Sequence, residues 1–118
     1  MHELSYIMDI INSVKELQEK EGAKNVEKIV LEVGKMSGVV PYYLEKYFNE
    51  VKDKASLENT VLEVHEMEVK IKCSSCSKIY IPGKENRYRC PVCGERSGDL
   101  IQGKGIIIKE VTIEDGLN

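Results

Sequence analysis

Residues 73–94 read CSSCSKIYIPGKENRYRCPVCG, in which two C-x-x-C pairs are separated by thirteen residues. A tight turn between two cysteines three positions apart lets both sulfurs reach one ion, and Gly94 relieves the crowding that such a turn imposes. Two turns of this kind that face each other complete a tetrahedral shell of four thiolates, which structural zinc prefers. The stretch therefore predicts a zinc ribbon with the ligands Cys73, Cys76, Cys90 and Cys93.

Three other uses of the four cysteines are open. Disulfides are one, although an intracellular chain with paired C-x-x-C motifs favours metal. A thioredoxin-like redox pair is another, but it leaves the second pair without a role. A rubredoxin-like iron site shares the same shell of four thiolates. Because four thiolates close the shell, we expect the metal to be structural and not catalytic.

Charge separates the cysteine-rich stretch from the rest of the chain. Residues 73–104 carry a net charge of +3, whereas residues 1–72 carry −4 and residues 105–118 carry −2. About thirty residues bury too little apolar surface to fold alone, so the metal is expected to stabilise this module. We expect a zinc-ribbon domain at residues 73–104, inserted into a discontinuous α/β domain made of residues 1–72 plus 105–118.

Composition limits the class of protein. The chain has 118 residues, of which 42% are hydrophobic and 31% charged, as in folded globular proteins. No apolar run approaches the roughly 20 residues of a membrane-spanning helix, and no secretory signal is visible. There is no glycine-rich phosphate loop and no histidine placed to activate a nucleophile. We expect a cytoplasmic protein that is not an enzyme and has no membrane partner.

Hydrophobic periodicity predicts the scaffold. Apolar residues recur at spacings of three and four from Leu4 to Leu17, which is typical of an amphipathic helix, and Gly22 is a natural stop. A second helix is predicted to begin at Pro41 and to end before Ala55. β-Branched residues and alternating polarity predict strands at residues 26–33, 61–72 and 106–113.

The last two predicted strands share an irregularity. Their inside–outside alternation changes phase, near His65 in one and between Ile108 and Val111 in the other, as a β-bulge or a sharp twist would produce. The shared irregularity favours pairing between these two strands. We expect an α+β fold with two helices packed on a three-stranded sheet and the zinc-ribbon module inserted between the second and third strands.

The chain opens with Met1-His2-Glu3, and a histidine at position two can chelate in a way that no internal histidine can. The α-amine of Met1, the backbone nitrogen of His2 and its imidazole can close two adjacent chelate rings on one ion. The backbone nitrogen or the carboxylate of Glu3 can take a fourth position in the plane. Such a set suits Ni(II) or Cu(II), and we expect the chelate to be shallow and exposed. The alternative is that His2 and Glu3 are only the solvated start of a helix.

Two further interpretations concern the remaining polar residues. His65 is the only other histidine, and we expect it to be partly buried and hydrogen-bonded and not to be a ligand.

An alternative function is a zinc-ribbon adaptor that binds nucleic acid or protein without nickel transfer. Its contact surface would consist of basic residues interleaved with Tyr80 and Tyr88, namely Lys78, Lys84, Arg87, Arg89 and Arg96. Because the net charge is −3, we expect no nucleic-acid partner.

Together these motifs resemble the HypA/HybF proteins. The resemblance rests on Met1-His2-Glu3-Leu4-Ser5, on Leu31-Glu32-Val33-Gly34 leading to Ser37-Gly38-Val39-Val40-Pro41, on the two cysteine pairs and on Gln102-Gly103. It extends from Met1 through the last predicted strand. It implies a nickel metallochaperone for nickel-iron hydrogenase maturation, with nickel at Met1, His2 and Glu3 and zinc at the four cysteines.

The resemblance also implies partners. Such proteins work with a GTPase, HypB, to load nickel into the precursor of the hydrogenase large subunit, and some also supply urease, which adds urease accessory proteins as partners. Some relatives have histidines beside the cysteine pairs, and many have a carboxylate where this chain has Val40. This chain has neither. We expect Ni(II) as transported cargo, Zn(II) as a structural metal, and either a monomer or a homodimer.

Overall fold

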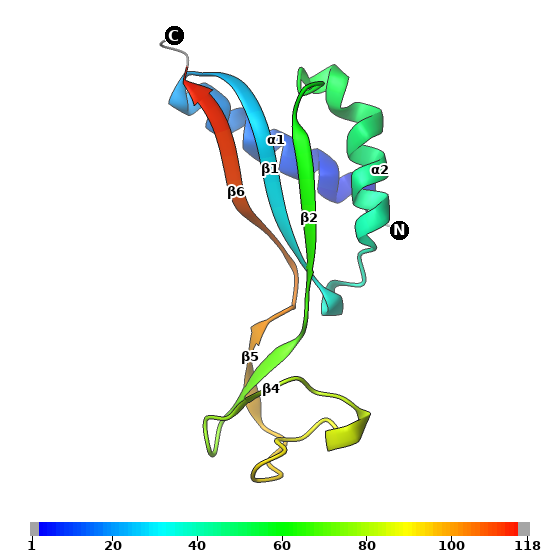
Figure 1. Cartoon of the computed structure of the whole chain (residues 1–118), viewed down its shortest axis with the longest axis vertical. Coiled ribbons are helices and arrows are strands. Elements are labelled where there is room, and N and C mark those ends of the chain that lie inside the picture. Colours follow the sequence, from blue (N-terminus) through cyan, green and yellow to red (C-terminus); the bar gives the residue numbers. More distant parts are fainter. Residues whose placement is uncertain (1–2, 116–118) are drawn as a thin grey trace. The chain divides into compact units, whose positions relative to one another are not determined.

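The structure, a computed structural model, describes residues 3–115 and contains two α-helices and two three-stranded sheets in that range (Figure 1). The elements are α1 (Glu3–Glu21), β1 (Ala23–Gly34), the short helix η1 (Lys35–Ser37), α2 (Pro41–Val51), η2 (Lys52–Ala55), β2 (Val61–Met67), β3 (Lys70–Cys73), β4 (Ile79–Tyr80), η3 (Lys84–Asn86), β5 (Gly98–Gln102) and β6 (Ile106–Asp115). Within residues 3–115, neither α1 nor α2 is both long enough and apolar enough to cross a membrane.

The chain divides into two compact units, which are described separately. The helical unit comprises the residues up to Glu32, Val39–His65 and the residues from Ile107 onward. The cysteine unit comprises Val33–Gly38 and Glu66–Ile106. Each unit contains its own cluster of buried side chains.

The helical unit follows the predicted α+β arrangement. Its sheet has the strand order β2-β1-β6, α1 passes behind the strands in Figure 1, and α2 packs against α1. The core is formed by apolar side chains from both helices and from β1, among them Ile7, Val14, Ile29, Leu44 and Phe48, all at most 1% exposed. Two predicted helix boundaries are confirmed: α1 ends before Gly22, which has a φ of +64°, and α2 begins at Pro41. The second helix was predicted to end before Ala55, but α2 ends at Val51 and the 3-10 helix η2 continues through Ala55.

Two predictions about the strands are wrong. Residues 61–72 form two strands and not one, because β2 ends at Met67 and β3 begins at Lys70 in a second sheet with the order β4-β3-β5. The change of phase therefore marks the passage from one sheet to the other. β2 and β6 are also not neighbours, because β1 lies between them. At the break, the carbonyl of Glu68 accepts a hydrogen bond from the Gln102 side-chain amide at 3.0 Å.

Within the cysteine unit, the end of β1 lies against the connection between β5 and β6. The Gly34 amide donates to the Gly105 carbonyl at 2.8 Å, and the Met36 amide donates to the Gly103 carbonyl at 3.0 Å. A Cβ at Gly34 would lie 2.1 Å from the carbonyl carbon of Gly103, so no side chain fits there. The ion pair of Lys35 with Glu68 lies in the same unit, and the bond to Glu68 raises the pKa of Lys35.

Candidate metal centre

Each of the two cysteine pairs lies on a turn with the same backbone hydrogen bonds. The Ser77 amide donates to the Cys73 carbonyl at 3.1 Å, and the Gly94 amide donates to the Cys90 carbonyl at 2.9 Å. Ser77 and Gly94 both have left-handed backbone conformations, with φ values of 65° and 76°. The predicted role of Gly94 is confirmed. Ser77 follows the first cysteine pair at the position that Gly94 has after the second, so the sequence already indicated where the first turn takes a left-handed conformation.

The two turns bring the four predicted ligands to one point. All four sulfur atoms lie within 4.8 Å of one another, with Cys73–Cys93 and Cys76–Cys90 separations of 3.5 Å. A tetrahedron with metal–sulfur bonds of about 2.3 Å has sulfur–sulfur edges of about 3.8 Å. The four cysteines are free thiols, and 3.5 Å is far longer than the roughly 2.05 Å of a disulfide. The residues present therefore fit a structural Zn(II).

The pKa values of the thiols in the cluster also favour a bound cation. Burial opposes the ionisation of Cys90, but amide hydrogen bonds from Cys93 and Val92 outweigh it and lower the pKa of this thiol to about 6. The Glu95 amide favours the thiolate of Cys93, but the Cys73 sulfur and burial outweigh that effect and raise the pKa of Cys93 to about 12. Four thiolates cannot ionise together unless a positive charge offsets their repulsion.

A small core supports the cluster. Cys73 and Cys90 are each 2% exposed, Tyr80 is 5% exposed, and Ile71 packs against all three. Burial, followed by the nearby thiols, raises the pKa of Tyr80. The expectation that Tyr80 forms part of an exposed stacking surface is wrong. Tyr88, which is 59% exposed, is the one ribbon tyrosine available for such contacts.

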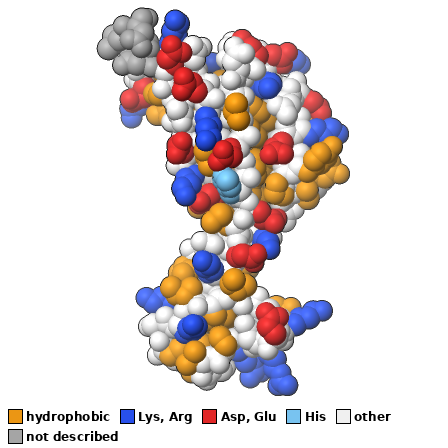
Figure 2. All heavy atoms as spheres, viewed as in Figure 1, with side chains coloured by type: hydrophobic (Ala, Val, Ile, Leu, Met, Phe, Trp, Pro, Cys, Tyr) orange, Lys and Arg blue, Asp and Glu red, His pale blue; other side chains and the backbone are white. Residues whose placement is uncertain are grey.

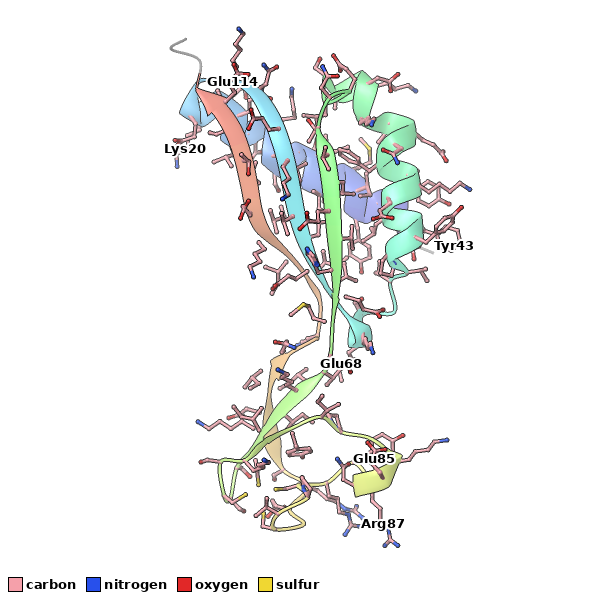
Figure 3. The ribbon with its side chains drawn as sticks, viewed as in Figure 1. Lys20, Tyr43, Glu68, Glu85, Arg87 and Glu114 are labelled. Atoms are coloured by element: carbon pink, nitrogen blue, oxygen red, sulfur yellow. The ribbon has the colours of Figure 1, made fainter. Side chains whose placement is uncertain are left out.

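The sequence did not single out Asn86, which organises the loop before the second cysteine pair. Its Oδ1 accepts from the amides of Gly83 and Tyr88 at 3.1 and 3.0 Å, and its Nδ2 donates to the Ile81 carbonyl at 2.9 Å. These bonds hold Arg87 and Tyr88 in left-handed conformations, with φ values of 56° and 59°. The side chain of Arg87 projects away from the loop in Figure 3.

Of the predicted nickel motif, Met1 and His2 lie outside the described residues. Glu3 is 1% exposed, so the expectation of an exposed or solvated side chain is wrong for this residue. Its Oε2 accepts a hydrogen bond from the Val40 amide at 3.1 Å, whereas Oε1 is buried and has no hydrogen-bond partner among residues 3–115. Sequence patterns gave no sign of this contact, because its donor is a backbone group.

His65 does not join a metal site. Its side chain is 53% exposed, so the predicted partial burial is wrong, but the predicted hydrogen bond is present, 2.5 Å from Nε2 to Glu63. Hydrogen bonds from His65 and then Lys28 lower the pKa of Glu63. Within residues 3–115, the four cysteines are the single His, Cys, Asp and Glu group whose ligand atoms converge as a metal site requires.

The fold and this cluster define a small α+β protein with a four-thiolate, ribbon-type metal site. The sequence model of the family described as "HypA: Hydrogenase/urease nickel incorporation, metallochaperone, hypA" matches residues 1–113. The chain therefore belongs to the HypA family of nickel metallochaperones. The predicted family is confirmed.

Individual proteins agree with this assignment. Hydrogenase maturation factor HypA of Aquifex aeolicus (strain VF5) is 32% identical over 114 residues, which cover 97% of this chain and 98% of the relative. HypA of Streptomyces avermitilis is 32% identical over 117 residues, covering 98% and 89%. The solution structure of the Ni metallochaperone HypA from Helicobacter pylori shares the fold, with a TM-score of 0.72, 20% identity and coverage of 98% and 99%.

Proposed function

We propose that this protein binds Ni(II) at Met1, His2 and Glu3 and, with a HypB-type GTPase, delivers it to the hydrogenase large-subunit precursor in the cytoplasm. The observation that carries the proposal is the match of a nickel-incorporation family to residues 1–113, a range that includes the N-terminal motif and both cysteine pairs. Residues 1–72 plus 105–118 would form the nickel-binding domain, and residues 73–104 the zinc ribbon. Urease is the other recipient in the family's description.

The chemistry of the N-terminal donors suits a carrier that must release its cargo. The α-amine and the imidazole have ordinary pKa values of about 8 and 6.5, so protons compete with nickel and affinity falls as the pH falls. The carboxylate of Glu3 is buried and already accepts the Val40 amide. This contact argues against the carboxylate as the donor and favours the backbone nitrogen of Glu3, which binds nickel only after it releases its amide proton to the solvent.

Calorimetric titration with Ni(II) tests the site. We expect His2→Ala, and a variant with two residues added before Met1, each to bind nickel at least about tenfold more weakly. His65→Ala is the matched control, because it removes the only other histidine, which is exposed and bonded to Glu63. Unchanged affinity in both N-terminal variants would remove this site from the proposal.

We propose Zn(II) as the resident metal of the four cysteines. The support is a closed shell of four sulfurs within 4.8 Å of one another. Metal analysis of the purified protein should give one zinc per chain and a colourless solution. A coloured protein that contains iron would favour a rubredoxin-like site instead.

We further propose that the loop around Arg87 and Tyr88 contacts the partner proteins. The cysteine unit carries nine Lys and Arg against five Asp and Glu, and basic side chains gather at its end in Figure 2. Arginine and tyrosine are frequent at the centres of protein interfaces. Nucleic-acid binding, the alternative, keeps only Tyr88 as a stacking residue, because Tyr80 is buried.

The partner contact can be tested with a charge reversal. Arg87→Glu should weaken binding to the HypB-type GTPase or to the hydrogenase precursor, and the loss should shrink as salt is added. Lys20→Glu, a reversal at an exposed position of the helical unit, is the control. Equal effects of the two variants on both partners would show that the loop makes no specific contact.

A further inference from the structure

We propose that the side chain of Glu3 is a positioning residue for nickel and not a nickel ligand. Its carboxylate anchors the first turn of α1 to the start of α2. The anchor thereby fixes the backbone nitrogen of Glu3, which is one of the nickel donors proposed above. This inference rests on the N-terminal nickel site proposed above and specifies how the protein holds that site in place.

The first observation is the place of the contact. Val40 is the N-cap residue of α2, and its carbonyl accepts from the amides of Tyr43 and Leu44 at 3.0 and 3.4 Å. No side chain of α2 caps this end, because the N-cap position is a valine. The first amides of a helix lack intrahelical acceptors, and the N-terminal end is electropositive. The Glu3 carboxylate therefore supplies, from another helix, the cap that α2 does not make for itself.

The second observation is the burial of the carboxylate. A glutamate in the first turn of α1 interacts favourably with the dipole of α1 even when it is exposed. Glu3 is instead 1% exposed, with Oε1 buried and without a partner among residues 3–115. Burying a carboxylate with one direct donor opposes folding. The bond from the Val40 amide offsets part of this cost and fixes the first turn of α1 against the start of α2.

The third observation concerns the rest of the turn. Ile7, one helical turn after Glu3, is fully buried, so both residues face the interior of the helical unit. Helix ends commonly fray, but a first turn held at both positions cannot do so without exposing Ile7. A chelate that uses the Glu3 nitrogen then begins from ordered backbone. Mutation of groups that orient metal ligands in this way typically lowers metal affinity by about 10–100-fold.

The test compares variants that distinguish an anchor from a ligand. Nickel affinity and the ligand-field absorption spectrum of the nickel-loaded protein are measured for Glu3→Gln, Glu3→Ala, Val40→Pro and Val40→Ala. Glutamine keeps an oxygen that accepts the Val40 amide, so we expect its affinity and spectrum to match the wild type. Glu3→Ala and Val40→Pro, which remove the acceptor and the donor, should each lose about 10–100-fold. Val40→Ala keeps the amide and should bind as the wild type does.

The possible results distinguish a positioning role of Glu3 from a ligand role. If Glu3→Gln loses as much affinity as Glu3→Ala and its spectrum shifts, the carboxylate is a ligand and the proposal is overturned. It is also overturned if Glu3→Ala and Val40→Pro both bind like the wild type while His2→Ala does not; the nickel site then stands without the anchor. Unchanged binding by His2→Ala instead removes the nickel site itself. Should Glu3→Ala fail to fold, the comparison of Val40→Pro with Val40→Ala decides, because it leaves the N-terminal residues intact.

Discussion

Ser77 is expected to weaken the first cysteine turn, and replacing it with glycine should strengthen zinc binding. Ser77 and Gly94 follow their cysteine pairs at the same position, and both have left-handed backbone conformations. A residue with a Cβ adopts this conformation at a cost of about 1–2 kcal/mol, whereas glycine adopts it freely. The second turn therefore has the residue that its geometry favours, and the first does not.

The expected gain is smaller than the strain. A new glycine also makes the unfolded chain more flexible, which costs about 0.5–1 kcal/mol. Ser77→Gly should therefore stabilise the zinc-bound turn by a net of about 0.5–1 kcal/mol, or about two- to fivefold in zinc affinity. Ser75→Gly is the matched control, because Ser75 is exposed and does not have a positive φ. It should show the entropic loss and the loss of one long hydrogen bond, 3.4 Å from its hydroxyl to Glu95.

Zinc competition against a chromophoric chelator, together with thermal unfolding of the zinc-bound protein, measures both variants. The difference between Ser77→Gly and Ser75→Gly equals the backbone strain, about 1–2 kcal/mol, plus the small contribution of the hydrogen bond from Ser75 to Glu95. The reverse change in the second turn, Gly94→Ser, should weaken zinc binding. If Ser77→Gly binds zinc no more tightly than Ser75→Gly, the left-handed conformation is not a source of strain and the reasoning fails.

Three further predictions concern stability and proton release. Phe48→Ala should lower the free energy of unfolding by about 3–5 kcal/mol in urea titration, because this side chain is 1% exposed; a loss below 1 kcal/mol would contradict its place in the core. Gly34→Ala should destabilise by at least about 1–3 kcal/mol in the same assay, whereas Gly105→Ala, whose Cβ would have open space, should be tolerated; equal effects would contradict the close contact. At pH 7, zinc binding should release at least two protons, because the pKa of Cys93 is raised to about 12 and that of Cys76 is also raised. Affinity should therefore rise with pH, and calorimetry in buffers of different ionisation enthalpy counts the protons; release of fewer than two would refute this.

Local patterns predicted the parts of the fold that depend on local physics. The spacing of the four cysteines and the glycine after the second pair were enough to predict the metal cluster, because each turn involves only five consecutive residues. The start of α2 at Pro41 and the stop of α1 before Gly22 follow from backbone preferences of single residues. These predictions needed no knowledge of which strands pair.

Strand pairing could not be predicted in the same way. A change of phase in the inside–outside alternation has the same sequence signature whether a strand bulges or leaves one sheet for another. The break after Met67 is visible only once β3 is seen to pair with β4 and β5. Tyr80 was misplaced for a related reason, since the core that buries it forms only when Cys73 and Cys90 come together.

The burial of Glu3 shows where side-chain patterns fail most fully. Its partner is 37 positions away and donates through a backbone amide, which every residue except proline supplies. Val40 therefore keeps the anchor, because the bond needs only its backbone amide. The side chain and the anchor can thus be varied separately at this one position. An aspartate introduced as Val40→Asp should add a nickel donor without disturbing the bond to Glu3, whereas Val40→Pro should break that bond and add none.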